Sequence, residues 1–132
     1  MTLLRRVLWT GGMLVAVLSL PLIVVPGAVV EGILGQDPVA DDVWIRLFGT
    51  AGVTLGLLHV LILRKLEDLW WWCWAFVIFD GLSAVVVIVH AVIGLPEGSA
   101  AWPWWVYGLG SAVLAALYLG GLARAGQEKP FA

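Results

Sequence analysis

Asp80 is the residue of this sequence with the greatest potential for chemistry, because it is the one charged side chain within residues 69–96. If this segment is a helix, with about 100° of rotation per residue, Asp80, Ser83 and His90 lie within about 80° of one another. A lone ionised carboxylate surrounded by hydrocarbon costs several kcal/mol. Asp80 is therefore expected to be protonated, paired with a base, or in contact with water in a cavity.

Two other apolar segments, residues 43–63 and 104–123, carry polar stripes of their own. With a rise of about 1.5 Å per residue, Thr54 and Ser111 on these stripes lie about as deep as Asp80. The three stripes predict one pocket that binds a ligand or conducts protons. Its candidate residues are Asp80, Arg46, Thr50, Thr54, Ser83, His90, Tyr107 and Ser111.

The partner of Asp80 is open at this point. Arg46 is the base best able to reach toward Asp80, with His90 as the second choice, and the gap to Arg46 is about 10 Å along the helix axis. Direct pairing then needs an extended arginine side chain or a bridging water. A purely structural role is an alternative, in which protonated Asp80 donates a hydrogen bond to Thr54 or Ser111 and holds its helix against its neighbours. A proton or ion pathway is a further alternative.

The composition indicates that these stripes belong to membrane-spanning helices. Hydrophobic residues make up 62% of the 132 residues and charged residues only 12%, about half the charge of a soluble domain. A helix needs about 20 apolar residues to cross the hydrocarbon core. We predict an all-α, integral membrane four-helix bundle that forms a single domain over residues 1–132, and we exclude a water-soluble globular enzyme. The predicted helices span about residues 7–29, 43–63, 69–93 and 104–123.

The basic residues predict how the bundle is oriented. Six of the seven fall on one side of the predicted membrane, which identifies that side as cytoplasmic. The helices then run antiparallel with both termini inside, and the clear basic bias suits a bacterial inner (cell) membrane. The six residues are Arg5, Arg6, Arg64, Lys65, Arg124 and Lys129.

The first apolar segment follows Arg5 and Arg6, as a signal peptide would. Its uncharged run is too long for one, so we expect it to stay as a membrane anchor, kinked at Pro21 because proline removes a backbone donor.

Glycines on the second apolar segment predict a close helix contact. Gly49, Gly52 and Gly56 share one face, and small residues allow the backbones of membrane helices to approach. His59 continues this face and is expected to be structural. Such small-residue faces favour packing within the chain, although a homo-oligomer stays open.

The sequence lacks the residues that several kinds of site require. The single cysteine, Cys73, cannot form an intrachain disulfide, and His59 and His90 lie near opposite membrane faces, so no metal or haem site is expected. The sequence has no phosphate-binding glycine loop and no basic patch beyond the orienting residues. We expect no cofactor and no nucleic-acid partner, and no motif supports catalysis.

Three short patterns resemble a known family. They are Arg46-Leu47-Phe48-Gly49, Leu55-Gly56-Leu57-Leu58 and the mid-membrane pair Asp80-Gly81. Over roughly residues 44–123 the chain resembles the small bacterial four-helix membrane proteins of the DoxX-like and BphX-like type, most of them of unknown function. The resemblance implies a compact antiparallel bundle without a soluble domain, and it transfers no catalytic residues.

These observations favour a non-enzymatic protein of the lipid bilayer. We expect it to bind a hydrophobic small molecule, a lipid or a quinone in the pocket around Asp80, or to serve as an accessory subunit of a membrane protein partner. The first alternative is a proton-linked small transporter or channel unit that uses Asp80. The second is a membrane enzyme acting on a lipid or quinone.

Overall fold

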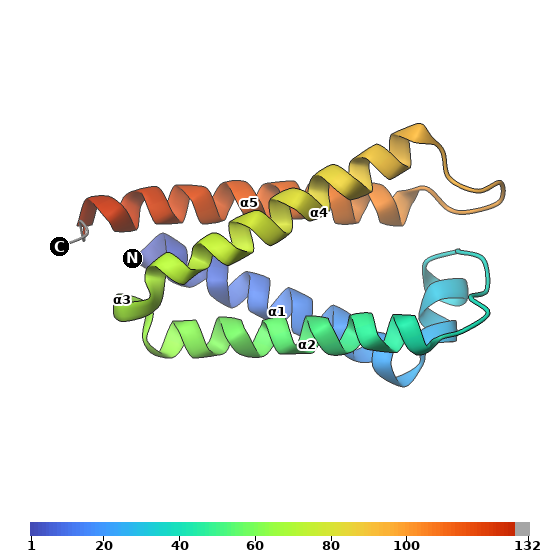
Figure 1. Cartoon of the computed structure of the whole chain (residues 1–132), viewed down its shortest axis with the longest axis horizontal. Coiled ribbons are helices and arrows are strands. Elements are labelled where there is room, and N and C mark those ends of the chain that lie inside the picture. Colours follow the sequence, from blue (N-terminus) through green and yellow to red (C-terminus); the bar gives the residue numbers. More distant parts are fainter. Residues whose placement is uncertain (129–132) are drawn as a thin grey trace.

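The structure is a computed structural model that describes residues 1–128, so the predicted cytoplasmic Lys129 lies outside the described residues. Helices form every element of the described chain, in an order that Figure 1 shows. The long helices are α1 (Thr2–Val24), α2 (Val43–Arg64), α4 (Trp74–Ile93) and α5 (Trp102–Glu128). The short elements are a π-helix (Ala28–Ile33), the one-turn α3 (Leu66–Leu69) and a 3₁₀ turn (Trp70–Cys73).

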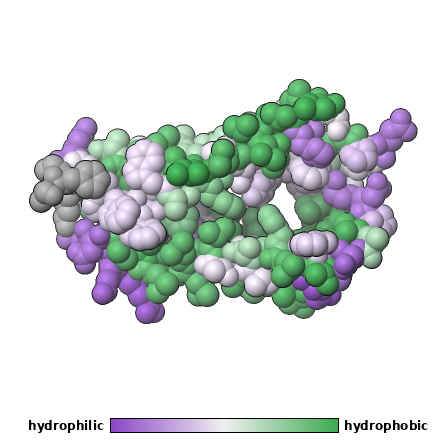
Figure 2. Space-filling view, viewed as in Figure 1, coloured by the Kyte–Doolittle hydropathy of each residue, from purple (hydrophilic) through white to green (hydrophobic). Residues whose placement is uncertain are grey.

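Four segments of the described chain are long and apolar enough to cross a membrane: Thr2–Val24, Val43–Arg64, Leu66–Ile93 and Trp102–Glu128. Their large apolar side chains face outward, and Figure 2 shows a hydrophobic surface along the middle of the molecule with hydrophilic residues gathered at its two ends. The prediction of an all-helical chain with four membrane-length helices is confirmed.

The first helix differs from its predicted bounds. It begins at Thr2 and ends at Val24, so Arg5 and Arg6 lie inside it rather than before it. Val25 leaves the helical conformation (φ −135°, ψ 57°), because a residue before a proline is disfavoured in the α region and Pro26 has no N–H to donate. The distribution of charge alone conceals this break, because Val25 and Pro26 are uncharged like the helix before them.

The long helices pack as two pairs, α1 with α2 and α4 with α5, and α1 joins the pairs by packing on α5. Glycines make the contact within each pair close. A Cβ atom on Gly49 would lie 2.9 Å from the backbone oxygen of Ser19, and one on Gly108 would lie 2.7 Å from a side-chain carbon of Ile88. Hydrophobic attraction between helices is absent in lipid, so such close packing is what holds a pair together.

The two ends of the molecule differ. At one end, which we call the terminal end, lie the two described chain ends and α3 (Figure 1). Here the amino group of Met1 forms a 2.6 Å ion pair with Glu128. The connections α1–α2 and α4–α5 lie at the other end, which we call the loop end. The buried core belongs to the terminal half, where its residues are Leu4, Val7, Leu8, Ile62, Leu66, Trp70, Cys73, Phe76, Tyr118, Leu122 and Ala125.

Candidate functional site

A buried polar contact closes the terminal half of the bundle. His59 of α2 and Tyr118 of α5 are joined by a 2.8 Å hydrogen bond between Nε2 and the phenol oxygen. Phe76 of α4 stacks on the His59 ring with centroids 3.8 Å apart. Three helices therefore meet at one histidine.

The hydrogen bonds of His59 define which ring nitrogen carries the proton. Nδ1 lies 2.7 Å from the backbone oxygen of Leu55, which can only accept. Nδ1 is therefore the donor, and in the neutral ring Nε2 accepts the hydrogen of the Tyr118 hydroxyl. Both polar groups are satisfied within the core, which agrees with the predicted structural role of His59.

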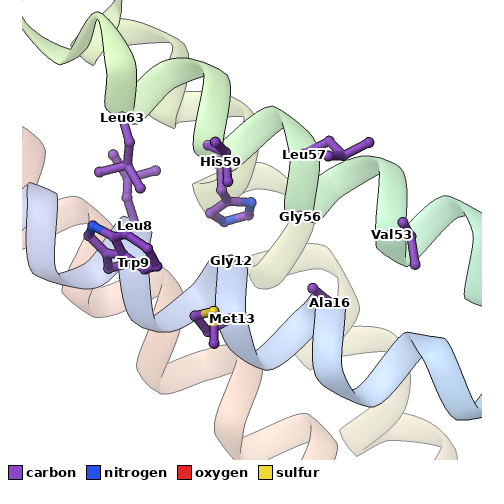
Figure 3. A pocket seen from close by; sticks show the side chains of 11 residues that line it. Leu8, Trp9, Gly12, Met13, Ala16, Val53, Gly56, Leu57, His59 and Leu63 are labelled. Carbon is purple, nitrogen blue, oxygen red and sulfur yellow. The ribbon is translucent and has the colours of Figure 1, made fainter.

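The remaining long helix, α1, leaves space for this contact at two glycines. A Cβ atom on Gly12 of α1 would lie 2.8 Å from Cβ of His59, and one on Gly11 would lie 2.5 Å from the Tyr118 hydroxyl. Figure 3 shows the His59 ring projecting from α2 toward Gly12. Gly11 and Gly12 were not singled out from the sequence, because the space they leave is filled by residues far along the chain.

The side chains on the inward faces of α1 and α2 are buried in the terminal half and exposed toward the loop end. Residues seven apart share a helix face. On α1, Leu4 is fully buried and Leu18, two such steps away, is 65% exposed. On α2, Ile62 is 2% exposed and Phe48, again two steps away, is 57% exposed. The same faces that build the core in the terminal half are uncovered in the loop half.

The second helix pair shows the same change. On α4, Phe76 is buried, Ser83 is half-buried and His90 is exposed. On α5, Tyr118 is fully buried and Tyr107 is 40% exposed. The two pairs therefore separate toward the loop end, and Figure 2 shows an opening that passes between them in this half. We call this opening the slot. Helical periodicity from the buried residues Ile62, Phe76 and Tyr118 puts on its bordering faces Phe48 and Leu55 of α2, Asp80, Ser83 and Val87 of α4, and Tyr107 and Ser111 of α5.

Asp80 lies at the closed end of the slot. It follows Phe76 by one helical turn and stands half-buried at the middle of the span Leu66–Ile93. No residue of the described chain forms a hydrogen bond or ion pair with its carboxyl group. A polar group at this depth without a protein partner is costly.

Arg46, the first candidate partner of Asp80, is engaged elsewhere. Its guanidinium contacts the carboxylate of Asp42, with Nη2 to Oδ2 3.0 Å, and donates to the backbone oxygen of Ile23. That oxygen belongs to the last turn of α1, where the break at Val25 leaves carbonyl groups without helical donors. Arg46 therefore caps α1 at the loop end and does not approach Asp80.

The two threonines of the predicted pocket are also occupied by their own helix. The Thr50 hydroxyl donates to the backbone oxygen of Arg46 at 2.8 Å, and the Thr54 hydroxyl donates to the backbone oxygen of Thr50 at 2.9 Å. Both side chains are exposed. The polar residues of α2, Arg46, Thr50 and Thr54, thus lie beside the slot. The polar faces of α4 and α5, which carry Asp80 and Ser111 respectively, border it.

The remaining predicted residues divide between the slot and its loop end. Ser83 of α4 and the buried Ser111 of α5 share the faces of Phe76 and Tyr118, respectively. His90 contacts Trp104 edge-on, with ring centroids 4.7 Å apart. The structure therefore brings Asp80, Ser83, Tyr107 and Ser111 to the slot and keeps Arg46, Thr50, Thr54 and His90 apart from Asp80.

Hydrogen bonds connect the two helix pairs again at the loop end. The side-chain amide of Gln36, in the α1–α2 connection, donates to the backbone oxygen of Ala100 at 2.9 Å and accepts from the indole N–H of Trp104 at 3.1 Å. The Ala100 N–H donates to the backbone oxygen of Gly35 at 3.0 Å. We call these four residues the clasp. Sequence reasoning did not find the clasp, because Gln36 and Ala100 are 64 positions apart.

Replacing Gln36 with alanine is expected to let the helix pairs separate further at the loop end, because two of the three hydrogen bonds of the clasp are lost. Spin labels at Val39→Cys and Glu97→Cys, in a Cys73→Ala background, report this distance by double electron–electron resonance. A longer or broader distance distribution than in the matched Gln127→Ala variant is the expected result. Identical distributions would show that the clasp does not hold the pairs.

The surface also carries two apolar grooves outside the slot. One runs between α1 and α2 around Gly12 and Gly56 (Figure 3), and the other lies between α4 and α5 around Ala84 and Ala115. Neither contains any of the eight predicted site residues. Both are lined almost entirely by apolar atoms.

Within residues 1–128 no three metal-ligating side chains come together. The architecture is that of a multi-pass helical membrane protein. Comparisons with protein-family models, with curated proteins and with solved structures each found no match. The resemblance to the DoxX-like proteins stays a prediction, and function rests on the geometry of the slot.

Proposed function

We propose that this protein is a non-enzymatic, multi-pass protein of a bacterial inner membrane that binds a hydrophobic small molecule or lipid in the slot between its helix pairs. The observation that carries the proposal is the placement of Asp80, whose carboxyl group is half-buried at mid-span and lacks a protein partner at the closed end of the slot. A bound molecule would supply that partner.

The rest of the slot supports the proposal. Its walls are apolar apart from hydroxyl groups such as those of Ser83 and Ser111. Side chains that face an empty space lose the dispersion contacts that packing provides. In a membrane an open slot of this kind fills with an apolar chain, and the residues on its walls decide which chain is favoured.

A channel is less well supported than a binding site. On the terminal side of Asp80 the interior is filled by Phe76, His59 and Tyr118, and beyond them by Leu4 and Leu8, which are fully buried. Among residues 1–128, this packed half leaves no continuous polar path from Asp80 to the terminal end. A proton-linked transporter would have to open this core in each cycle.

The proposal includes an antiparallel bundle whose terminal end faces the cytoplasm, because basic residues such as Arg64 and Lys65 gather at that end. In a Cys73→Ala background, a membrane-impermeant maleimide is expected to label Glu97→Cys on intact cells and Lys65→Cys only after permeabilisation. The opposite labelling pattern would show that the terminal end faces the outside and would contradict the proposed orientation.

Filling the slot tests the binding function. Ser83→Phe places a large side chain on the slot-facing stripe of α4, whereas Leu82→Phe adds a ring to a neighbouring side chain that is already 63% exposed. Native mass spectrometry of protein released from lipid nanodiscs is expected to show a retained hydrophobic molecule on wild-type protein and on Leu82→Phe, and a several-fold lower fraction on Ser83→Phe. Equal retention by all three would contradict binding in the slot.

A further inference from the structure

We infer that the slot selects a molecule whose polar group is uncharged, a hydroxyl or a carbonyl, and which reaches Asp80 from the bilayer interior. This inference rests on the proposed binding function and identifies its ligand class. It follows from which charges the described residues place around the slot, from the depth of Asp80, and from the directions in which the slot is open.

Among the described residues, an anionic head group finds no positively charged partner in the slot. Arg46, the base of α2 closest to the slot, is bound to Asp42 and to the backbone of Ile23. The imidazole of His90 contacts Trp104 near the loop end. Because Asp80 itself is acidic, a carboxylate or phosphate brought to the closed end would meet either its repulsion or a medium without a counter-charge.

A cationic head group would find one counter-charge, but at a high cost. An ammonium group and an ionised Asp80 at mid-span must both lose their hydration, and the attraction between two buried charges often fails to repay that loss. The surrounding groups supply little further solvation, since Ser83 and Ser111 offer single hydroxyls and Leu55 and Val87 offer none. An uncharged carboxyl group avoids this cost, because it can donate to and accept from a neutral hydroxyl or carbonyl without moving a charge out of water.

The openings of the slot lead to hydrocarbon rather than to water. The clasp connects the helix pairs across the loop end through Gln36, Ala100 and Trp104, and the packed core closes the terminal side. The opening seen in Figure 2 lies between the pairs, along the sides of the apolar spans. A molecule that dissolves in the bilayer interior therefore has the shortest path to Asp80, and molecules with an uncharged polar group are those that can reside there.

Three probes with the same chain and different head groups test this inference: 1-dodecanol, dodecylamine and dodecanoate. They are offered at equal concentrations to the full-length protein in nanodiscs, and the fraction of protein carrying each one is measured by native mass spectrometry. Wild-type protein is expected to retain dodecanol roughly fivefold more than either charged probe, which corresponds to the net contribution of one neutral hydrogen bond. Asp80→Asn keeps an uncharged hydrogen-bonding group of the same shape and is expected to keep this preference, whereas Asp80→Leu is expected to lose it. Glu97→Gln, which removes a charge from an exposed loop, is the control and is expected to behave as wild type.

The outcomes separate the inference from the function on which it rests. A preference for dodecylamine that disappears in Asp80→Asn would show an ionic site and overturn the inference, while leaving binding in the slot intact. A preference for dodecanol that persists in Asp80→Leu would overturn it as well, because selection would not depend on Asp80. Retention of none of the probes, together with no effect of Ser83→Phe on the retained native molecule, would overturn the proposed function itself.

Discussion

Replacing Gly49 with valine is expected to separate α1 from α2 and to lower the free energy of unfolding by about 2 kcal/mol or more, the scale of overpacking in a core. The reason is that a Cβ atom at this position would lie 2.9 Å from the backbone oxygen of Ser19 and 2.8 Å from Ile23. A backbone atom cannot rotate away as a side-chain end can, so the helices must move apart. Unfolding of the detergent-solubilised protein, followed by loss of helical circular dichroism, measures the effect.

Gly110 provides the matched control. It also lies within a long helix, but a Cβ atom there would have no atom within 4 Å. Gly110→Val is therefore expected to change stability by only a few tenths of a kcal/mol, since glycine is itself a poor helix former. Equal losses of stability in the two variants would mean that helix propensity, and not the α1–α2 contact, explains the result.

Replacing Tyr118 with phenylalanine is expected to cost about 1 to 3 kcal/mol, because it leaves Nε2 of the buried His59 without its donor. The aromatic ring and its packing against Phe76 are kept, so the loss reports the hydrogen bond. The free energy of unfolding in detergent is again the measurement. Because this contact joins α2 to α5, its loss should also weaken the attachment of one helix pair to the other.

Tyr107→Phe makes the same chemical change on the same face of α5. Tyr107 is 40% exposed and forms no hydrogen bond within the described residues, so its replacement is expected to leave stability nearly unchanged. If Tyr107→Phe lowers the free energy of unfolding as much as Tyr118→Phe, the hydrogen bond between His59 and Tyr118 is not what stabilises the terminal half.

The membrane-length helices could be predicted because the distribution of charge is a local property of the sequence. The segments without charge are long, and the residues that interrupt them, such as Arg64 and Lys65, lie at the ends of helices in the structure. The predicted end of the first helix, at about residue 29, lies several residues beyond its observed end at Val24, because Val25 and Pro26 continue the uncharged run while the backbone leaves the helix. Hydropathy does not distinguish an apolar helix from an apolar break.

The site was predictable only in part. Helical periodicity put Asp80 and Ser83 of α4 on one face, and in the structure both lie on the face of α4 that carries Phe76 and borders the slot. Periodicity does not reveal which way one helix is turned against another, so it could not show that Arg46 of α2 caps α1 instead of approaching Asp80. Contacts between residues far apart in the chain, such as that of Gln36 with Ala100, leave no periodic signal.

The slot, with Asp80 at its closed end, is proposed to be a binding site for a molecule from the bilayer. A crystal structure of the protein grown in a lipidic mesophase tests it most directly. We predict elongated density between the two helix pairs, ending in a polar group within hydrogen-bonding distance of the Asp80 carboxyl group. Helix pairs that close against each other in the loop half, with Asp80 hydrogen-bonded to a protein group and no density between them, would contradict the claim.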